Sequence, residues 1–256
     1  MSSRRDFIVS GATVGAAAVS GGLLARLSHA QAVGYVAGPV SGGGAVTGTL
    51  KISGKAPEPD RFIIGKDNHV CGEGHAAHDT VALAANAGIT NAVVALAGIQ
   101  RGLGWAANHQ PGIVQEKCTF RPYLQVAAPG AELVIHNKDP LLHNIHAYEL
   151  VGRARRTLFN IAQPQAGQID RHKLELRRGH IVELDCDAHN WMSAWVYVSE
   201  HPYVTVTGDG GGFRLKDIPA GSYELIAWHP LLGSSRAPVT VAEGREQTLE
   251  LQLGTA

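Results

Sequence analysis

The 256-residue chain lacks several features that would assign it to a large class of proteins. Lysine and arginine total 22, and aspartate and glutamate also total 22, so there is no excess of positive charge to bind nucleic acid or an anionic membrane. Neither a G-x-S-x-G nor an H-E-x-x-H pattern occurs, and no other spaced set of hydrolytic or nucleophilic residues is found. We therefore expect neither an enzyme nor a nucleic-acid partner.

Long helical repeats are also scarce, whereas glycine and proline are frequent, with 31 and 12 residues. Short alternating segments such as residues 45–52 and 248–253 lie between turn-forming residues. Alternation with a period of two is typical of strands with one buried face. The composition and the pattern together predict an all-β chain of many short strands.

The N-terminal 32 residues resemble a twin-arginine export signal. Arg4 and Arg5 precede a run from Ile8 to Leu24 that is rich in glycine and alanine, and residues 30–32 offer a small-residue cleavage site. The run is too weakly apolar for a membrane span, which needs about 20 strongly apolar residues. We expect residues 1–32 to be a signal peptide and the mature chain to be periplasmic, without a membrane span; an uncleaved anchor is the alternative.

The richest stretch in chemical terms is residues 186–192, which reads Cys-Asp-Ala-His-Asn-Trp-Met. Thiolate, imidazole and thioether ligands together favour copper. A short loop between two strands can direct Cys186, His189 and Met192 to one ion because the three are closely spaced. A further ligand must then come from another strand end, where His143 opens an H-N-x-H motif. The C-x2-H pattern alone is also compatible with zinc.

These two motifs together resemble those of the cupredoxins, and the short ligand loop is similar to the amicyanin-like type. The resemblance covers roughly residues 112–200, and residues 130–140 and 179–185 resemble the strands that precede the first histidine and the cysteine. It implies a Greek-key β-sandwich with one type 1 blue-copper ion. The implied ligands are His143, Cys186, His189 and Met192.

The resemblance also gives Asn144 a role and shows one departure. In cupredoxins, the asparagine after the first histidine ties that strand to the cysteine loop, so Asn144 is expected to brace the ligands. His146 lies three residues after His143 and is expected to be a packing or surface histidine rather than a ligand. Ala188 and Asn190 flank the second histidine, where amicyanin-like loops usually carry prolines.

The C-terminal residues 203–256 resemble a transthyretin-like, carboxypeptidase regulatory-like domain. An Asp-Gly-rich turn precedes Phe213, and residues 219–225 read P-x-G-x-Y-x-L. The resemblance implies a second β-sandwich. Residues 44–59 also resemble the start of such a domain, which leaves two arrangements open. Residues 44–111 form a separate β segment, or their first strands complete the C-terminal sheet and the copper module is an insertion.

Three cysteines are an odd number for an exported chain. If Cys186 binds copper, Cys71 and Cys118 remain to form a disulfide, which suits an oxidising compartment; two unrelated buried thiols are the alternative. His69, His75 and His78 lie close to Cys71 in sequence. A second metal site there is conceivable, but no spaced carboxylate or cysteine pair completes a ligand set, so a surface loop is favoured.

The sequence as a whole predicts a periplasmic blue-copper protein that transfers single electrons between redox proteins of the cytochrome or dehydrogenase type. Two other functions stay open. One is a copper carrier or assembly factor that delivers the metal itself. The other is a partner-binding β-sandwich module in which the metal site is vestigial.

Overall fold

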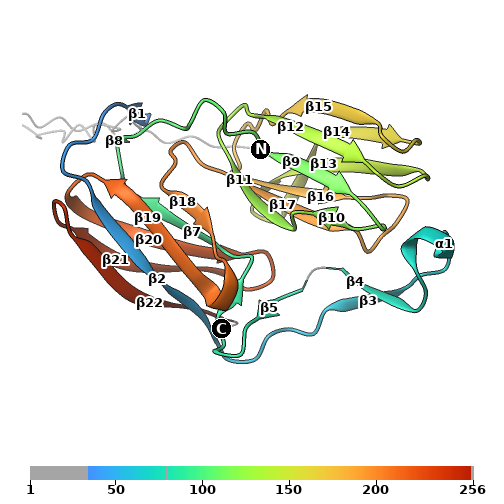
Figure 1. Ribbon diagram of the computed structural model, residues 1–256, viewed down its shortest axis with the longest axis horizontal. Helices are drawn as coiled ribbons and strands as arrows, with labels where there is room; N and C mark the ends of the chain where they lie inside the picture. Colours follow the sequence, from blue (N-terminus) through green and yellow to red (C-terminus); the bar gives the residue numbers. More distant parts are fainter. Residues whose placement is uncertain (1–33, 79, 255–256) are drawn as a thin grey trace, which may run out of the picture. The chain divides into compact units, whose positions relative to one another are not determined.

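A computed structural model describes residues 34–78 and 80–254 of the chain (Figure 1). The expected export signal lies outside the described residues. Within them, strands dominate, and the helical elements are α1 (Asn68–Cys71) and the short 3-10 turn η1 (Asp209–Gly211). The predicted all-β class is therefore confirmed. Among the described residues, the structure contains no helix that is both long and apolar enough to span a membrane.

Nine strands between residues 112 and 198 form a β-sandwich, which we call the site sandwich (Figure 1). One sheet has the order β10-β9-β12-β15, and the other has the order β11-β17-β16-β13-β14. The first comprises β9 (Gly112–Gln115), β10 (Phe120–Arg121), β12 (Glu132–Asn137) and β15 (Ile169–Lys173). The second comprises β11 (Leu124–Ala127), β13 (His143–Val151), β14 (Ala154–Gln163), β16 (Ile181–Asp185) and β17 (Ser193–Val198).

Alternating side chains build the core between these two sheets. In β12 and β16, every second residue is buried, as expected for strands that cover a core with one face. Leu133 and Ile135 of β12 lie in the same apolar cluster as Val182 and Leu184 of β16. Cys186, Trp191 and Met192 belong to this cluster as well, so both ends of the ligand loop are packed in the core.

A second group of strands, the flanking sandwich, is built from both ends of the described chain. One sheet has the order β18-β7-β20-β21 and the other β19-β2-β22. Strand β2 pairs in parallel with β22 and antiparallel with β19, and β7 lies between β18 and β20. The bounds are β2 (Gly44–Ser53), β7 (Val93–Ala97), β18 (Val204–Val206), β19 (Gly212–Ile218), β20 (Gly221–His229), β21 (Gly233–Val241) and β22 (Glu246–Gly254).

These pairings place strands from the N-terminal 100 residues beside strands from the C-terminal 53, with the site sandwich between them in sequence. Gly48 of β2 lies where a Cβ would meet the carbonyl oxygen of Leu249, so the close parallel pairing requires glycine there. The resemblance of residues 203–256 to transthyretin-like domains stays a prediction.

Three two-stranded ribbons complete the fold. β1 (Val36–Ala37) pairs with β8 (Arg101–Gly102), and β5 (Ala82–Leu83) pairs with β6 (Ile89–Thr90). The third ribbon joins β3 (Asp60–Ile63) to β4 (His75–His78), with α1 between the two strands. We call residues 60–78 the β3–α1–β4 segment.

A buried carboxylate fixes the loop that leads into β16. Glu149 of β13 is 0% exposed, and its Oε1 accepts the backbone N–H groups of Arg177, Arg178 and Gly179 at 2.8, 2.7 and 2.6 Å. Its Oε2 pairs with the Arg156 guanidinium. Burial alone would raise the pKa of Glu149, but these donors outweigh it and lower the pKa to about 2. The start of β16, the strand that leads to Cys186, is thereby anchored.

Replacing Glu149 with glutamine should lower the free energy of unfolding at pH 7 by about 2 kcal/mol, because charge-assisted bonds to buried donors are lost. Denaturant unfolding measures this. The folded pKa is lowered, so the contribution is complete above the ordinary value of 4.5 and is lost as the pH falls towards 2. The difference between wild type and variant should therefore shrink below pH 4.5.

Glu132→Gln, in an exposed pair with Arg171, is the control and should cost about 0.5 kcal/mol or less. A pH-independent difference would contradict this assignment.

Candidate metal centre

Two neighbouring strands of the site sandwich deliver the predicted ligands to one end of their sheet. β13 begins at His143, and β16 ends at Asp185, one residue before Cys186. The two strands are antiparallel neighbours, with His146 opposite Asp185. The start of one strand therefore lies beside the end of the other, which brings His143 and Cys186 together although 43 residues separate them.

The loop from Cys186 to Met192 consists of two successive tight turns. The His189 N–H donates to the Cys186 carbonyl at 3.2 Å, and the Met192 N–H donates to the His189 carbonyl at 2.9 Å. The Cys186 N–H closes the loop by donating to the Met192 carbonyl at 3.3 Å. Each x2 spacing of the motif thus corresponds to one turn. Met192 is buried in the core of the site sandwich, directly before β17.

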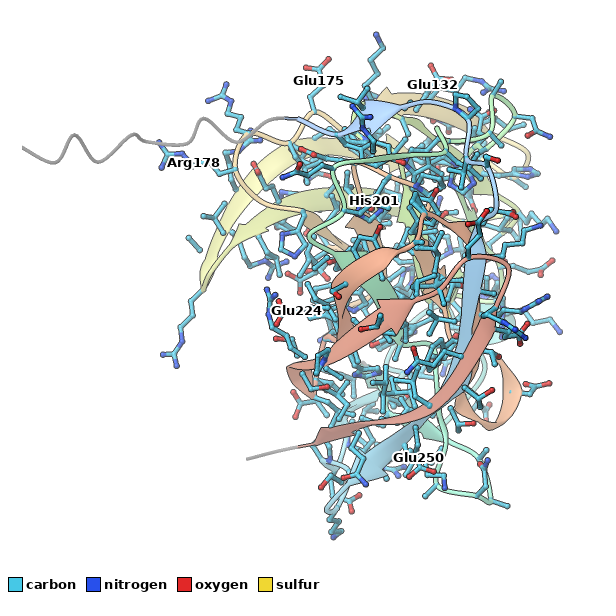
Figure 2. The ribbon with its side chains drawn as sticks, turned by 90° about the vertical axis from the view of Figure 1, so that its left-hand side faces the viewer. Glu132, Glu175, Arg178, His201, Glu224 and Glu250 are labelled. Atoms are coloured by element: carbon cyan, nitrogen blue, oxygen red, sulfur yellow. A yellow bond between two sulfur atoms is a disulfide. The ribbon has the colours of Figure 1, made fainter. Side chains whose placement is uncertain are left out.

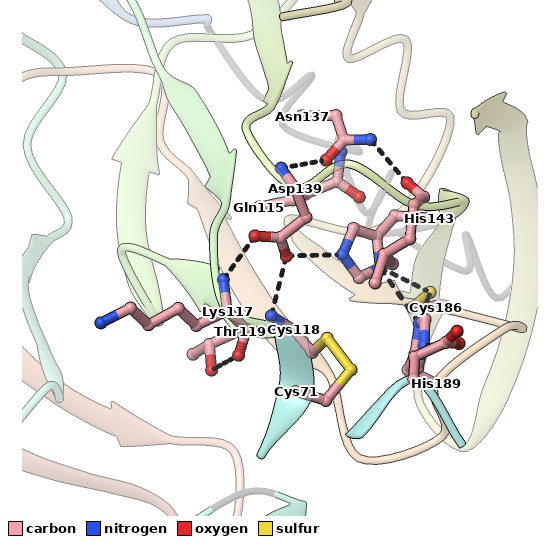
Figure 3. Close-up of polar contacts among 12 residues, drawn as sticks. Cys71, Gln115, Lys117, Cys118, Thr119, Asn137, Asp139, His143, Cys186 and His189 are labelled. Atoms are coloured by element: carbon pink, nitrogen blue, oxygen red, sulfur yellow. Dashed lines mark hydrogen bonds and ion pairs between the residues drawn. A yellow bond between two sulfur atoms is a disulfide. The ribbon is translucent and has the colours of Figure 1, made fainter. Parts of the chain in front are cut away.

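Three donor atoms converge in this buried place (Figure 3). Nδ1 of His143 lies 3.1 Å from Nδ1 of His189, and the Cys186 Sγ lies 4.0 and 3.8 Å from the two nitrogens. Bonds of about 2.0–2.3 Å from one ion in a trigonal plane would set the nitrogens about 3.5 Å apart and each nitrogen about 3.8 Å from the sulfur. The three atoms are therefore spaced as ligands of a single ion.

A buried carboxylate holds the far side of the first imidazole. Nε2 of His143 lies 2.8 Å from Oδ2 of Asp139, which also accepts the backbone N–H of Cys118 at 2.9 Å (Figure 3). Oδ1 of Asp139 accepts the N–H of Lys117 at 2.8 Å. Burial would raise the pKa of Asp139, but the bonds from Cys118, His143 and Lys117 outweigh it and lower the pKa. Asp139 is thus ionised at neutral pH and can only accept hydrogen bonds.

A second carboxylate holds the other imidazole. Nε2 of His189 lies 3.1 Å from Oδ2 of Asp67, which belongs to the β3–α1–β4 segment. Burial lowers the pKa of both His143 and His189, although the carboxylates oppose the shift, so both rings are neutral at neutral pH. A neutral ring that donates from Nε2 carries a lone pair on Nδ1.

The two Nδ1 atoms therefore present lone pairs to each other across 3.1 Å in a buried site. Two acceptors at this distance repel, and a cation between them removes the repulsion. The Cys186 thiol lies against both, and burial raises its pKa, so the thiol is protonated at neutral pH and a metal ion would have to displace that proton on binding. Two imidazoles and a sulfur that converge in this way fit a copper ion.

Asn144 makes the contacts of a brace between β13 and the ligand loop. Its Oδ1 accepts the Ala188 N–H at 3.2 Å and lies 3.4 Å from the Cys186 Sγ. Its Nδ2 donates to Oδ2 of Asp187 at 2.9 Å. His146 also contacts Asp187, and its ring stacks on Tyr148, so of the two histidines of H-N-x-H only His143 belongs to the converging donor atoms.

The two remaining cysteines lie beside the centre. Cys71 and Cys118 are joined in a disulfide, with a Cα–Cα distance of 5.1 Å. His69 in α1 and His75 in β4 are exposed, and His78 ends β4. Among the described residues, neither His69 nor His75 belongs to a cluster of potential metal ligands.

Sequence reasoning missed two residues of this centre, Asp67 and Asp139. Asp139 lies four residues before His143, within a run already associated with the first ligand strand. Asp67 lies four residues before Cys71. The disulfide between Cys71 and Cys118 brings the residues around Asp67 to the site. The predicted pairing of these cysteines was therefore the signal that could have identified Asp67.

Comparison with known proteins gives partial likenesses to cupredoxins. A purple cupredoxin from Nitrosopumilus maritimus matches with 21% identity over 35% of this chain and all of its own, at a TM-score of 0.30. An amicyanin variant matches with 14% identity over 37% of this chain and 86% of its own, at 0.28. A copper-containing nitrite reductase from Thermus scotoductus matches with 14% identity, at 0.28, and only 25% of that chain is covered. No protein-family model and no curated protein matches the chain. Because the identities and TM-scores are low, the site is characterised by the positions of its own atoms alone.

Replacing Asp139 with alanine should weaken metal binding by about 10–100-fold, because His143 loses the partner that orients its ring. The change also leaves the N–H groups of Lys117 and Cys118 without their acceptor, which should cost about 1–3 kcal/mol of stability. Competition with a copper chelator and denaturant unfolding measure the two effects. Asp209→Ala, at an exposed position in η1, is the control. Unchanged copper affinity in Asp139→Ala would contradict the role of this carboxylate.

Proposed function

We propose that the chain is an exported copper protein that transfers single electrons between redox proteins. One type 1 copper ion would be held by His143, Cys186, His189 and Met192. The observation that carries the proposal is the convergence of two imidazole Nδ1 atoms and one thiol sulfur in a buried site, with the nitrogen lone pairs facing each other.

Copper, when bound, supplies one-electron chemistry by changing between two oxidation states. The protein's part is to keep the ligands in place during that change. His143 and His189 would hold the ion through their Nδ1 atoms, and Cys186 would provide a soft, strongly coupled sulfur. Met192 would contribute a weakly held thioether, which tunes the potential more than it holds the ion.

Rigid support of the ligands favours electron transfer over release of the metal. Each imidazole is held at its far nitrogen by a carboxylate, and the cysteine loop is tied to β13 by Asn144. Ligands supported in this way change position little between oxidation states, as a fast electron carrier requires. A copper carrier must instead let its ligands open. The bracing therefore supports the electron carrier.

The three converging donor atoms are buried, which also supports a role outside catalysis, since catalytic metal sites keep one position open for water or substrate. The proposed partners are redox proteins of the cytochrome or dehydrogenase type. Export by the twin arginines and a periplasmic location complete the proposal. The disulfide between Cys71 and Cys118 is consistent with an oxidising compartment.

Copper-loaded protein should show an intense visible thiolate-to-copper band and a narrow hyperfine splitting in electron paramagnetic resonance. Cys186→Ser should abolish the band, because a hydroxyl cannot replace the soft sulfur. Met192→Leu should keep the colour and shift the reduction potential. His146→Ala is the matched control, since this histidine does not belong to the cluster of converging donor atoms, and it should leave the spectrum unchanged. A colourless protein that binds zinc as readily as copper would indicate a structural or vestigial site.

The electron-carrier role predicts a reversible voltammetric wave and slow loss of copper to a moderate chelator in both oxidation states. Retention follows from the buried ligands and their hydrogen-bonded carboxylates. Voltammetry and chelator competition on the same preparation test the two properties together. Stoichiometric transfer of copper to the chelator, without a reversible wave, would favour a copper carrier instead.

A further inference from the structure

The β3–α1–β4 segment lies on the site sandwich although it is more than 30 residues away from its first strand in sequence. Phe62, Ile64, Val70 and Ala76 of the segment pack against the core cluster that contains Cys186 and Met192. Figure 1 shows the ribbon of β3 and β4, with α1 at its tip, extending away from the rest of the N-terminal region. The segment is therefore a packed part of the metal centre's surroundings.

The segment covers one edge of the second histidine. His189 is only 1% exposed, whereas its loop neighbours Asp187 and Asn190 are exposed. Asp67 reaches its Nε2 across 122 residues of sequence. Asp67 itself adopts a left-handed backbone conformation with φ of 52°, which turns the chain at the start of α1. The carboxylate thus closes the edge of the ring that faces away from Cys186.

One covalent bond fastens this segment beside the other histidine. Cys71, at the end of α1, is joined to Cys118, and the backbone N–H of Cys118 is bound by Asp139, the partner of His143 (Figure 3). Both sulfurs of the disulfide also lie within 4.8 Å of a ring nitrogen of His189. The disulfide therefore connects the carboxylate supports of both imidazoles.

We propose that Asp67 is a positioning residue for His189, and that the disulfide-fastened β3–α1–β4 segment closes this edge of the centre against the exchange of copper. The proposal rests on the proposed function, because it assigns the segment a role towards the same metal. The segment keeps the His189 ring fixed with Nδ1 towards the other donors. Copper then leaves only when Asp67 and the segment move away from the ring.

The first test measures the release of Cu(I) from the copper-loaded protein to an excess of chelator. Asp67→Ala should release copper about 10–100-fold faster than wild type, the range found when a ligand's supporting partner is lost. Asp67→Asn should restore slow release, because its amide oxygen still accepts from Nε2. Glu73→Gln removes the same charge from an exposed position of the segment and should behave as wild type. Equal release by wild type and Asp67→Ala, or equal acceleration by Glu73→Gln, would overturn the proposal.

The second test needs no copper and separates this proposal from the proposed function. Diethyl pyrocarbonate acylates accessible neutral imidazoles, and mass spectrometry locates the product. In the metal-free protein, His189 should be protected in wild type and Asp67→Asn but modified in Asp67→Ala. A Cys71→Ser/Cys118→Ser variant should also expose it. If the wild-type protein is colourless with copper but shows this protection pattern, the copper function is refuted and the positioning of His189 by Asp67 still stands. Modification of His189 in the wild type would refute the closed edge whatever the colour.

Discussion

The centre depends on a repulsive pair of atoms, the Nδ1 lone pairs of His143 and His189 at 3.1 Å. If Nε2 of either ring had no partner, that ring could rotate, or a proton could lie between the two Nδ1 atoms. Asp139 and Asp67 prevent this, because each carboxylate accepts a hydrogen bond from Nε2–H, so the proton of the neutral ring stays on Nε2 and Nδ1 has none. The interior lowers the pKa of both rings and keeps them neutral. The fold thus holds two nitrogen atoms that repel each other, and a cation bound between them would remove the repulsion.

The strands and the ligand loop of the site sandwich maintain this arrangement. Antiparallel pairing of β13 and β16 sets His143 beside Cys186, and the two turns of the loop place His189 between Cys186 and Met192. Because the loop belongs to the core of the site sandwich, movement of a ligand would disturb apolar packing as well as hydrogen bonds. Glu149 adds a fixed point at the other end of β16. The same packing keeps the displacement of the ligand side chains small.

The sequence predicted the parts of this protein that are local. Alternation and frequent turns indicated an all-β chain, and the C-x2-H-x2-M spacing singled out a loop that the structure folds into two turns. Parallel pairing of β2 with β22 joins residues about 200 positions apart, and no local pattern chooses between that and a separate segment. The roles of Asp67 and Asp139 could not be predicted for a related reason. Single aspartates are common in loops, and these two are recognised only by the histidines that they contact in the folded chain.

Anomalous diffraction at the copper absorption edge, from crystals of the copper-loaded protein, tests the central claim most directly. We predict a single strong peak between Nδ1 of His143, Nδ1 of His189 and Sγ of Cys186, with Asp67 and Asp139 still bound to the Nε2 atoms. A peak elsewhere, for example beside His146 and Asp187, would contradict the account, and so would a copper bound through either Nε2.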